Sequence, residues 1–201
     1  MQVKKSEKPT PRGVYRPKFT FFHPNPKGTG TAVSMEVHPA HDNIEGSIFL
    51  SAANQLTVGD RTGDAPVYPR FDWENKMTVR LCFEDLCQIL MVLRGQCESI
   101  NEGRGLFHST SEFNTRIGFR HLIEPVSGYS LELSRMPVKP GACEQRARIL
   151  FTDAEAFGIS EAISGSMATI CFGMPMVIRR DEAAVKENCA QQNQKSRYVA
   201  A

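Results

Sequence analysis

The chain has 201 residues, 41% of them hydrophobic and 23% charged, which is typical of a single soluble domain with flanking tails. Its apolar runs are short and interrupted, which excludes a protein that spans a bilayer with roughly 20 consecutive apolar residues. The net charge of +2 is too small to indicate a nucleic-acid partner by itself.

Residues 1–14 are predicted to form a basic, disordered arm. From Met1 to Lys18 the chain has six basic residues and one acid, Glu7. Such an arm attracts polyanions through counterion release, although a merely solvated tail has the same composition. The segment lacks the apolar stretch of a secretory signal peptide, so we expect a cytoplasmic protein, with an organelle location left open.

Eight strand candidates follow the arm, four in each half of the chain. They are Lys18–His23, Thr29–His38, Gly46–Ala53, Lys76–Phe83, Leu106–Thr110, Thr115–Glu124, Tyr129–Met136 and Gln145–Phe151. A long loop, Thr57–Pro69, separates the third candidate from the fourth, and its length suggests function or disorder.

Each half is predicted to close with a helix. Glu84–Arg94 has an apolar face and is followed by a glycine. Thr152-x-x-Glu155 is a capping box that opens the second helix, and Phe172-Gly173 ends it.

The two strand-to-helix junctions also resemble each other, with Arg80 and Arg148 at matching places 68 residues apart. The predicted fold class is therefore α+β, with a duplicated ββββα unit: two antiparallel four-stranded sheets, each followed by a helix. This domain covers residues 15–173, and residues 174–201 are predicted to be a flexible tail.

The sequence has no set of residues suited to catalysis. The GxSxG, HExxH and Walker patterns are all missing from it. His38, His41 and Asp42 could begin a metal site, but they flank a proline at a predicted strand end, where a helical ligand face does not form. The six cysteines form no CxxC pair, which indicates reduced thiols and not a zinc site or disulfide framework. We therefore expect no enzyme, no metal and no cofactor.

Cations collect on one face of three predicted strands, where they alternate with apolar residues and no acid lies on the same stretches. They are Lys76, Arg80, Arg116, Arg120, Arg146 and Arg148. A polar outer face is usual for an antiparallel sheet. The bias to one sign of charge nevertheless favours a polyanionic ligand.

Aromatic residues lie close to these cations along the chain. They occur in Lys18–His23 (KFTFFH), Arg70–Trp73 (RFDW) and Phe107-His108. An exposed ring stacks on a nucleic-acid base with a gain of about 1–3 kcal/mol. Some of these rings are needed in the core: Phe19 and Phe22 point to opposite faces, so we expect one of them to face inward.

Three segments, in this order along the chain, resemble the Whirly family. Pro26–Glu36 (PKGTGTAVSME) is similar to the family's Lys-Gly-Lys-Ala-Ala-Leu strand, Phe71–Lys76 (FDWENK) to its Tyr-Asp-Trp-Ser-Arg-Lys segment, and Leu106–His108 (LFH) to its Phe-Phe-His segment. The similarity spans about residues 17 to 173. The resemblance implies two antiparallel four-stranded sheets, homotetramers assembled through the helices, and binding of single-stranded DNA with little sequence preference.

The chain departs from the family in two respects. Aligned without a gap from Ala32, the second lysine of the family's motif is replaced by Gly30, and Lys27 matches the first only with a gap. The organelle-targeting segment of the plant members is missing, which favours a bacterial or mobile-element origin.

The resulting prediction is a non-catalytic, homotetrameric protein that binds single-stranded DNA in replication, repair or recombination, without membrane contact. An RNA-binding or annealing protein of the same fold and a protein-assembly module are the alternatives. The predicted nucleic-acid-binding residues are Lys18, Phe21, Lys27, Phe71, Trp73, Lys76, Arg80, Phe107, His108, Arg116 and Arg120.

Overall fold

The computed structural model describes residues 18–173, except 42, 43, 61, 63, 64, 140 and 142. The predicted arm, the predicted tail and Asp42 of the candidate metal site therefore lie outside the described residues. No helix in the described ranges combines the length and hydropathy needed to cross a membrane.

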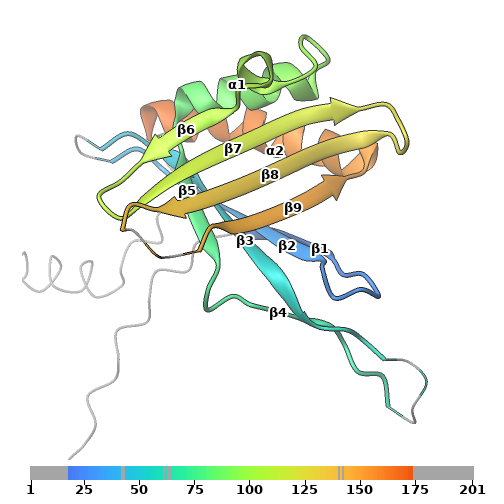
Figure 1. Ribbon diagram of the computed structural model, residues 1–201. Coiled ribbons are helices and arrows are strands. Elements are labelled where there is room, and N and C mark those ends of the chain that lie inside the picture. The colour runs from blue at the N-terminus through green and yellow to red at the C-terminus, as the bar shows by residue number, and fades with distance from the viewer. Residues whose placement is uncertain are drawn as a thin grey trace, which may run out of the picture.

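Two strand-rich units follow each other along the chain (Figure 1). The first consists of β1 (Lys18–His23), β2 (Thr31–His38), β3 (Ser47–Thr57), β4 (Arg70–Phe71), β5 (Met77–Leu81) and helix α1 (Phe83–Leu93). After a short 3₁₀ helix, η1 (Ile100–Gly103), the second consists of β6 (Leu106–Ser109), β7 (Phe113–Leu122), β8 (Gly128–Pro137), β9 (Gln145–Phe151) and helix α2 (Asp153–Phe172).

Each unit forms one antiparallel sheet. In sheet 1, β1, β2, β3 and β5 are neighbours in that order, and the two-residue β4 pairs with the far end of β3. In sheet 2 the order is β6-β7-β8-β9. The predicted duplicated ββββα architecture is confirmed, with β4 as an addition that the sequence did not indicate.

Side-chain hydrogen bonds explain where β2 begins and how β3 is held beyond the predicted end. The Asn25 side chain accepts from the backbone N–H groups of Lys27 and Thr29, which holds residues 25–29 in a turn and delays the start of β2 to Thr31. The Gln55 side chain accepts from the Gly30 N–H at 3.0 Å and donates to the Thr57 carbonyl. β3 therefore continues to Thr57, and the segment after it projects from the body as a narrow hairpin (Figure 1).

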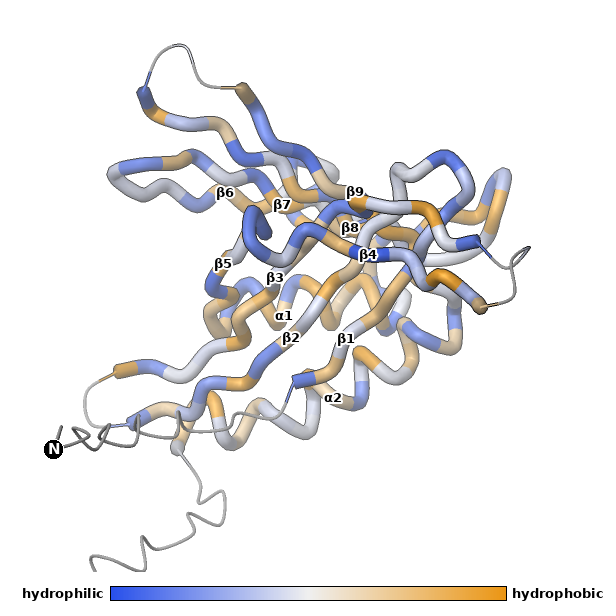
Figure 2. Tube along the Cα trace, turned by 90° about the horizontal axis from the view of Figure 1, so that it is seen from below, coloured by the Kyte–Doolittle hydropathy of each residue, from blue (hydrophilic) through white to orange (hydrophobic). Residues whose placement is uncertain are grey.

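One core serves both sheets and both helices. Figure 1 shows the sheets crossing, with α1 and α2 side by side behind sheet 2. Buried residues from both sheets and both helices pack together, among them Leu50, Phe119, Leu86 and Ile159. Figure 2 shows hydrophobic residues along both helices and along the strands that lie over them. Since helices cover one face of sheet 2, the opposite face is left to contact other molecules.

Both helices begin with an acid at their third residue that hydrogen-bonds back to the N-cap. Glu155 accepts from the Thr152 N–H at 2.8 Å, and Asp85 accepts from the Cys82 N–H at 2.9 Å. Helix α2 ends at Gly173, whose φ of 61° is left-handed, so the predicted cap and stop of this helix are confirmed.

Candidate nucleic-acid interface

The face of sheet 2 that points away from the helices has arginines on both sides of strand β8. Alternation places Arg116 and Arg120 of β7 and Arg146 and Arg148 of β9 on this outward face. Their apolar neighbours in sequence, such as Ile117 of β7, point into the core. Strand register sets Arg116 opposite Ser134, which is opposite Arg146.

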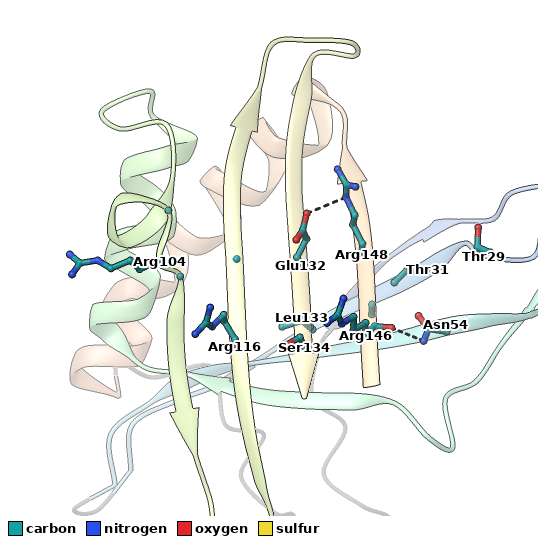
Figure 3. A pocket seen from close by; sticks show the side chains of 14 residues that line it. Thr29, Thr31, Asn54, Arg104, Arg116, Glu132, Leu133, Ser134, Arg146 and Arg148 are labelled. Atoms are coloured by element: carbon teal, nitrogen blue, oxygen red, sulfur yellow. Dashed lines mark hydrogen bonds and ion pairs between the residues drawn. The ribbon is translucent and has the colours of Figure 1, made fainter. Parts of the chain in front are cut away.

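A groove with a volume of about 760 Å³ crosses this face. Its walls include Arg104, Arg116, Arg146 and Arg148, and Figure 3 shows the side chains of Arg116 and Arg148 projecting from the strands. Asn54 of β3 donates to the Arg146 carbonyl at 2.9 Å, so the groove lies where the two sheets meet. A second depression of about 420 Å³ shares several lining residues with it and extends it toward η1.

The backbone at the rim of this groove is strained. Asn101 and Glu102 both have left-handed φ values, 47° and 54°. A non-glycine residue in this region costs about 1–2 kcal/mol, and such costs collect at functional sites. The strained turn precedes Arg104 and sets it at the groove wall. Sequence reasoning missed Arg104, although its position between Gly103 and Gly105 was a signal of unusual backbone.

Acidic residues from outside the three basic stretches lie among the arginines of this face. Glu132 of β8 pairs with Arg120 at 3.4 Å and with Arg148 at 3.3 Å. Glu144 pairs with Arg146 at 2.6 Å, and the hydrogen bond from Arg146 lowers the pKa of Glu144. Arg116 forms no ion pair with any residue that the structure describes. The sequence pattern concerned only the three stretches themselves, and Glu132 and Glu144 come from outside them.

Sheet 1 has a different outward surface, an aromatic cluster formed by Phe22, Phe71 and Trp73. The Phe22 ring lies 5.6 Å from the Phe71 ring and 6.4 Å from the Trp73 ring, and Phe22 is 56% exposed. The structure therefore brings together two rings that were predicted to bind nucleic acid. It adds Phe22, which strict alternation from Lys18 places on the outward face.

Phe21, by contrast, belongs to the core side of sheet 1. Its ring packs edge-on against the buried Phe151 at 5.2 Å, and Phe19 on the same face packs against Phe21 at 5.7 Å. Of Phe19 and Phe22, it is Phe19 that faces inward. The prediction of Phe21 as a nucleic-acid contact does not fit this position, since its ring is in contact with the core.

His108 also points toward the helices and not toward the outward face. It lies on the same face of β6 as the buried Leu106, and its Nε2 is 3.1 Å from Asp85 Oδ2 at the start of α1. The hydrogen bond with Asp85 raises the pKa of His108, and burial offsets this only in part. Burial alone would raise the pKa of Asp85, but hydrogen bonds from His108 and Cys82 outweigh it and lower the pKa.

A second histidine–carboxylate pair also joins the units, with the histidine now in the first unit and the acid in the second. His23 at the end of β1 contacts Glu155 of α2 at 2.7 Å. Each helix therefore holds, through the acid that caps it, a histidine from the first strand of the other unit. These contacts fasten the two units together and leave His108 no position in the groove.

The remaining predicted residues are distributed over both sheets. Phe107 is 63% exposed and lies opposite Arg116, so it extends the outward face of sheet 2. Lys18 and Arg80 share a row of sheet 1 at the end away from Phe22, and Arg80 donates to the Glu45 carbonyl at 2.9 Å. Lys76 and Lys27 are exposed, in the segment before β5 and in the β1–β2 turn. The predicted set thus forms two surfaces and not one.

Gly30, which replaces a lysine of the family motif, has a position that no side chain can occupy. A Cβ there would overlap the His23 carbonyl oxygen and the Gln55 side chain. The Gly30 N–H donates to the same Gln55 side chain, and Gly30 is buried. The departure from the motif therefore has a physical reason: this turn is closed around a glycine.

The chain resembles known proteins in structure but not in sequence. No protein-family model matches the chain, and no curated protein matches it in sequence. Its structure is similar to that of the plant transcriptional regulator PBF-2, with a TM-score of 0.58 and 17% identity over 78% of this chain and 82% of that one. It is also similar to that of WHY1 from Arabidopsis thaliana, with a TM-score of 0.62 and 16% identity over 85% of this chain and 94% of that one. Both are Whirly proteins, so the chain has the Whirly-like fold that its motifs indicated.

Proposed function

We propose that this protein binds single-stranded DNA, with little sequence preference, along the outward face of sheet 2. The observation that carries the proposal is the groove lined by Arg104, Arg116, Arg146 and Arg148. Guanidinium groups suit phosphate because they form charge-assisted, two-pronged hydrogen bonds with it. The attraction is directed at the backbone, so it carries no sequence information.

The shape of this surface favours a single strand over a duplex. The groove continues into the second depression, so its length crosses several strands of the sheet. A flexible single strand can follow such a path with its phosphates and turn its bases toward rings. The cluster of the exposed Phe22 with the half-buried Phe71 and Trp73 offers faces on which bases of any kind can stack.

We further propose that the protein acts as a homotetramer assembled through its helices. Helix α2 carries exposed Phe157 and Phe172, which are 70% and 80% accessible in the single chain. Large apolar side chains that stay exposed on a helix offer a surface to which another chain can bind, as larger exposed apolar patches do. The proposed binding surfaces of sheets 1 and 2 face away from the helices and would stay accessible in the assembly.

The proposed role is non-catalytic coverage of exposed strands during DNA replication, repair or recombination. The described cysteines are free thiols, which supports a cytoplasmic protein in a reducing environment. Binding that ignores sequence is the property that such a role requires, because the strands exposed in these processes have no common sequence.

Fluorescence anisotropy with labelled oligo-dT, a duplex of equal length and a matched RNA strand tests the proposal. We expect the DNA single strand to bind most tightly, with a logarithmic salt slope of about −0.7 for each phosphate contacted. Light scattering after size exclusion, with and without oligo-dT, measures the number of subunits. Equal affinity for single strand and duplex, or a flat salt response, contradicts the proposal. Tighter binding of the RNA strand would identify RNA, and not DNA, as the ligand.

A further inference from the structure

Glu132 lies at the centre of the arginine-lined groove. It is the middle residue of a row across sheet 2, with Gly118 of β7 on one side and Arg148 of β9 on the other. Its Oε1 atom is within 3.4 Å of both the Arg120 and Ser130 side chains and 3.3 Å from Arg148 Nε. Figure 3 shows its carboxylate turned toward Arg148.

This carboxylate presents to the arginines what a phosphate of a bound strand would present. A single oxygen accepts hydrogen bonds from the Arg120 guanidinium and the Ser130 hydroxyl and forms an ion pair with Arg148, and guanidinium groups bind carboxylate and phosphate in the same geometry. All three charged side chains are about half exposed. Exposed ion pairs of this kind stabilise a protein by roughly 0–1 kcal/mol, so a competing anion can replace one partner.

The floor of the groove beside Glu132 leaves room for such a competitor. Gly118 has no side chain, and the nearest atom to a Cβ placed there is Glu132 Cβ at 3.7 Å, an ordinary contact distance. Gly118 therefore does not need to be glycine to fold, yet its bare backbone keeps the space between Arg116 and Arg120 open. An approaching phosphate can reach the arginines without moving the strands.

We propose that Glu132 is an internal substitute for phosphate, which the backbone of a bound single strand displaces from Arg120 and Arg148. The inference rests on the proposed function, because it assumes that a nucleic acid enters this groove. Glu132 then determines the affinity: it keeps the arginines ordered in the unbound protein and reduces the net attraction for polyanions. Its removal improves binding, whereas removal of a contact residue weakens it.

The Glu132→Gln variant tests this, because glutamine keeps the shape and a hydrogen-bond acceptor but has no charge. With oligo-dT as the probe, we expect affinity to rise about three- to tenfold at low salt, the range expected from releasing two exposed ion pairs. The salt slope is expected to stay the same, because the bound strand contacts the same phosphates in both proteins. The matched control is Glu112→Gln, the same charge change at an exposed position in the β6–β7 turn, outside the groove lining. We expect it to change affinity less than twofold.

Other outcomes separate this inference from the proposed function. If the wild type binds oligo-dT and Glu132→Gln binds it equally or more weakly, Glu132 is not a phosphate substitute, although the proposed function stands. Weaker binding of both Glu132→Gln and Glu132→Ala, with a preference shifted away from cytosine-containing strands, would identify it as a base-contacting acid and overturn the inference. If neither the wild type nor the variant binds, the proposed function fails and the inference with it.

Discussion

In the proposed binding mode, the outward faces of the two sheets make different contributions. On sheet 2 the cations lie in one groove, across neighbouring strands, with acids placed among them. On sheet 1 the corresponding face has an aromatic cluster at one end and Lys18 and Arg80 at the other, four residues away from Phe22 along β1. At about 3.3 Å per residue, these two ends are roughly 13 Å apart.

The two halves of the repeated architecture therefore differ in their surfaces and not in the order of their elements. Both sheets have the same order of long strands and a helix behind them, so the architecture alone does not make one face basic and the other aromatic. The side chains at alternate strand positions make one face basic and the other aromatic. In the proposed binding mode, sheet 2 supplies the phosphate contacts and therefore the salt-dependent part of binding, and sheet 1 supplies base stacking and therefore the salt-independent part.

The largest effect is expected from reversing charge in the groove of sheet 2. In the triple variant Arg116→Glu, Arg146→Glu, Arg148→Glu, affinity for oligo-dT should fall on the order of a thousandfold, because three phosphate contacts become repulsive. Anisotropy titrations at several salt concentrations measure both the affinity and the slope, and circular dichroism checks that the fold is retained.

The matched control for that variant lies on sheet 1. Lys18→Glu with Arg80→Glu reverses two exposed cations, one of which already donates to the Glu45 carbonyl. We expect a loss of about tenfold or less, since the pair lies outside the groove. A loss as large as that of the sheet 2 variant would show that charge is not divided between the sheets as proposed.

A smaller effect is expected from the aromatic cluster. Trp73→Ala should weaken binding of oligo-dT about tenfold, which is within the range of one lost base stack, while the salt slope stays the same. The control is Tyr68→Ala, which removes an exposed ring of the projecting hairpin outside the cluster. If Trp73→Ala changed the slope, or if Tyr68→Ala weakened binding equally, stacking on sheet 1 would be refuted.

Local patterns in the sequence were sufficient for the architecture. Strict alternation located β1 and β9 with their observed bounds, and the capping box and glycine stop defined α2. These signals act over a few residues, so they can be read without knowing which strands pair. The same alternation, applied to residues 18–23, would have assigned Phe22 outward and Phe21 inward.

Pairing between distant segments could not be read in this way. Glu132 neutralises arginines on two other strands, and nothing near it in the sequence indicates that register. His108 follows an exposed phenylalanine, yet its partner is an acid 23 residues earlier whose local role is to cap a helix. Both cases concern which residues meet across the fold, and neither concerns which element they lie in.

His108 provides a test of the assignment to the core side, with an effect on stability and not on binding. His108→Gln should lower the free energy of unfolding by about 1 kcal/mol at pH 6, because a hydrogen bond between a histidine and a buried acid is lost. Affinity for oligo-dT at that pH should stay within twofold of the wild type. Thermal unfolding and anisotropy measure the two effects.

The pH dependence of this contact has a defined sign. Because the pKa of His108 is raised above its ordinary 6.5, its contribution is fully present below pH 6.5 and is lost as the pH rises through the raised value. Asp85 contributes above its ordinary 3.8 and loses its contribution as the pH falls through the lowered value. The wild type should therefore lose stability above pH 6.5 more steeply than His108→Gln does. Parallel curves for the two proteins would contradict the pairing.

The smallest effect is expected at the turn that departs from the family motif. Lys27 is exposed and outside the groove lining, so Lys27→Ala should weaken binding only about twofold and reduce the salt slope by less than about 0.7.

Thr29 lines the groove and is exposed, and Thr29→Lys should strengthen binding by a similar factor because it brings a cation to the groove wall. Gly30→Lys should instead unfold the turn, since its Cβ would overlap Gln55 and the His23 carbonyl. A stable Gly30→Lys protein with tighter binding would mean that the turn opens. It would also mean that the face of sheet 1 and the groove of sheet 2 are less separate than described above.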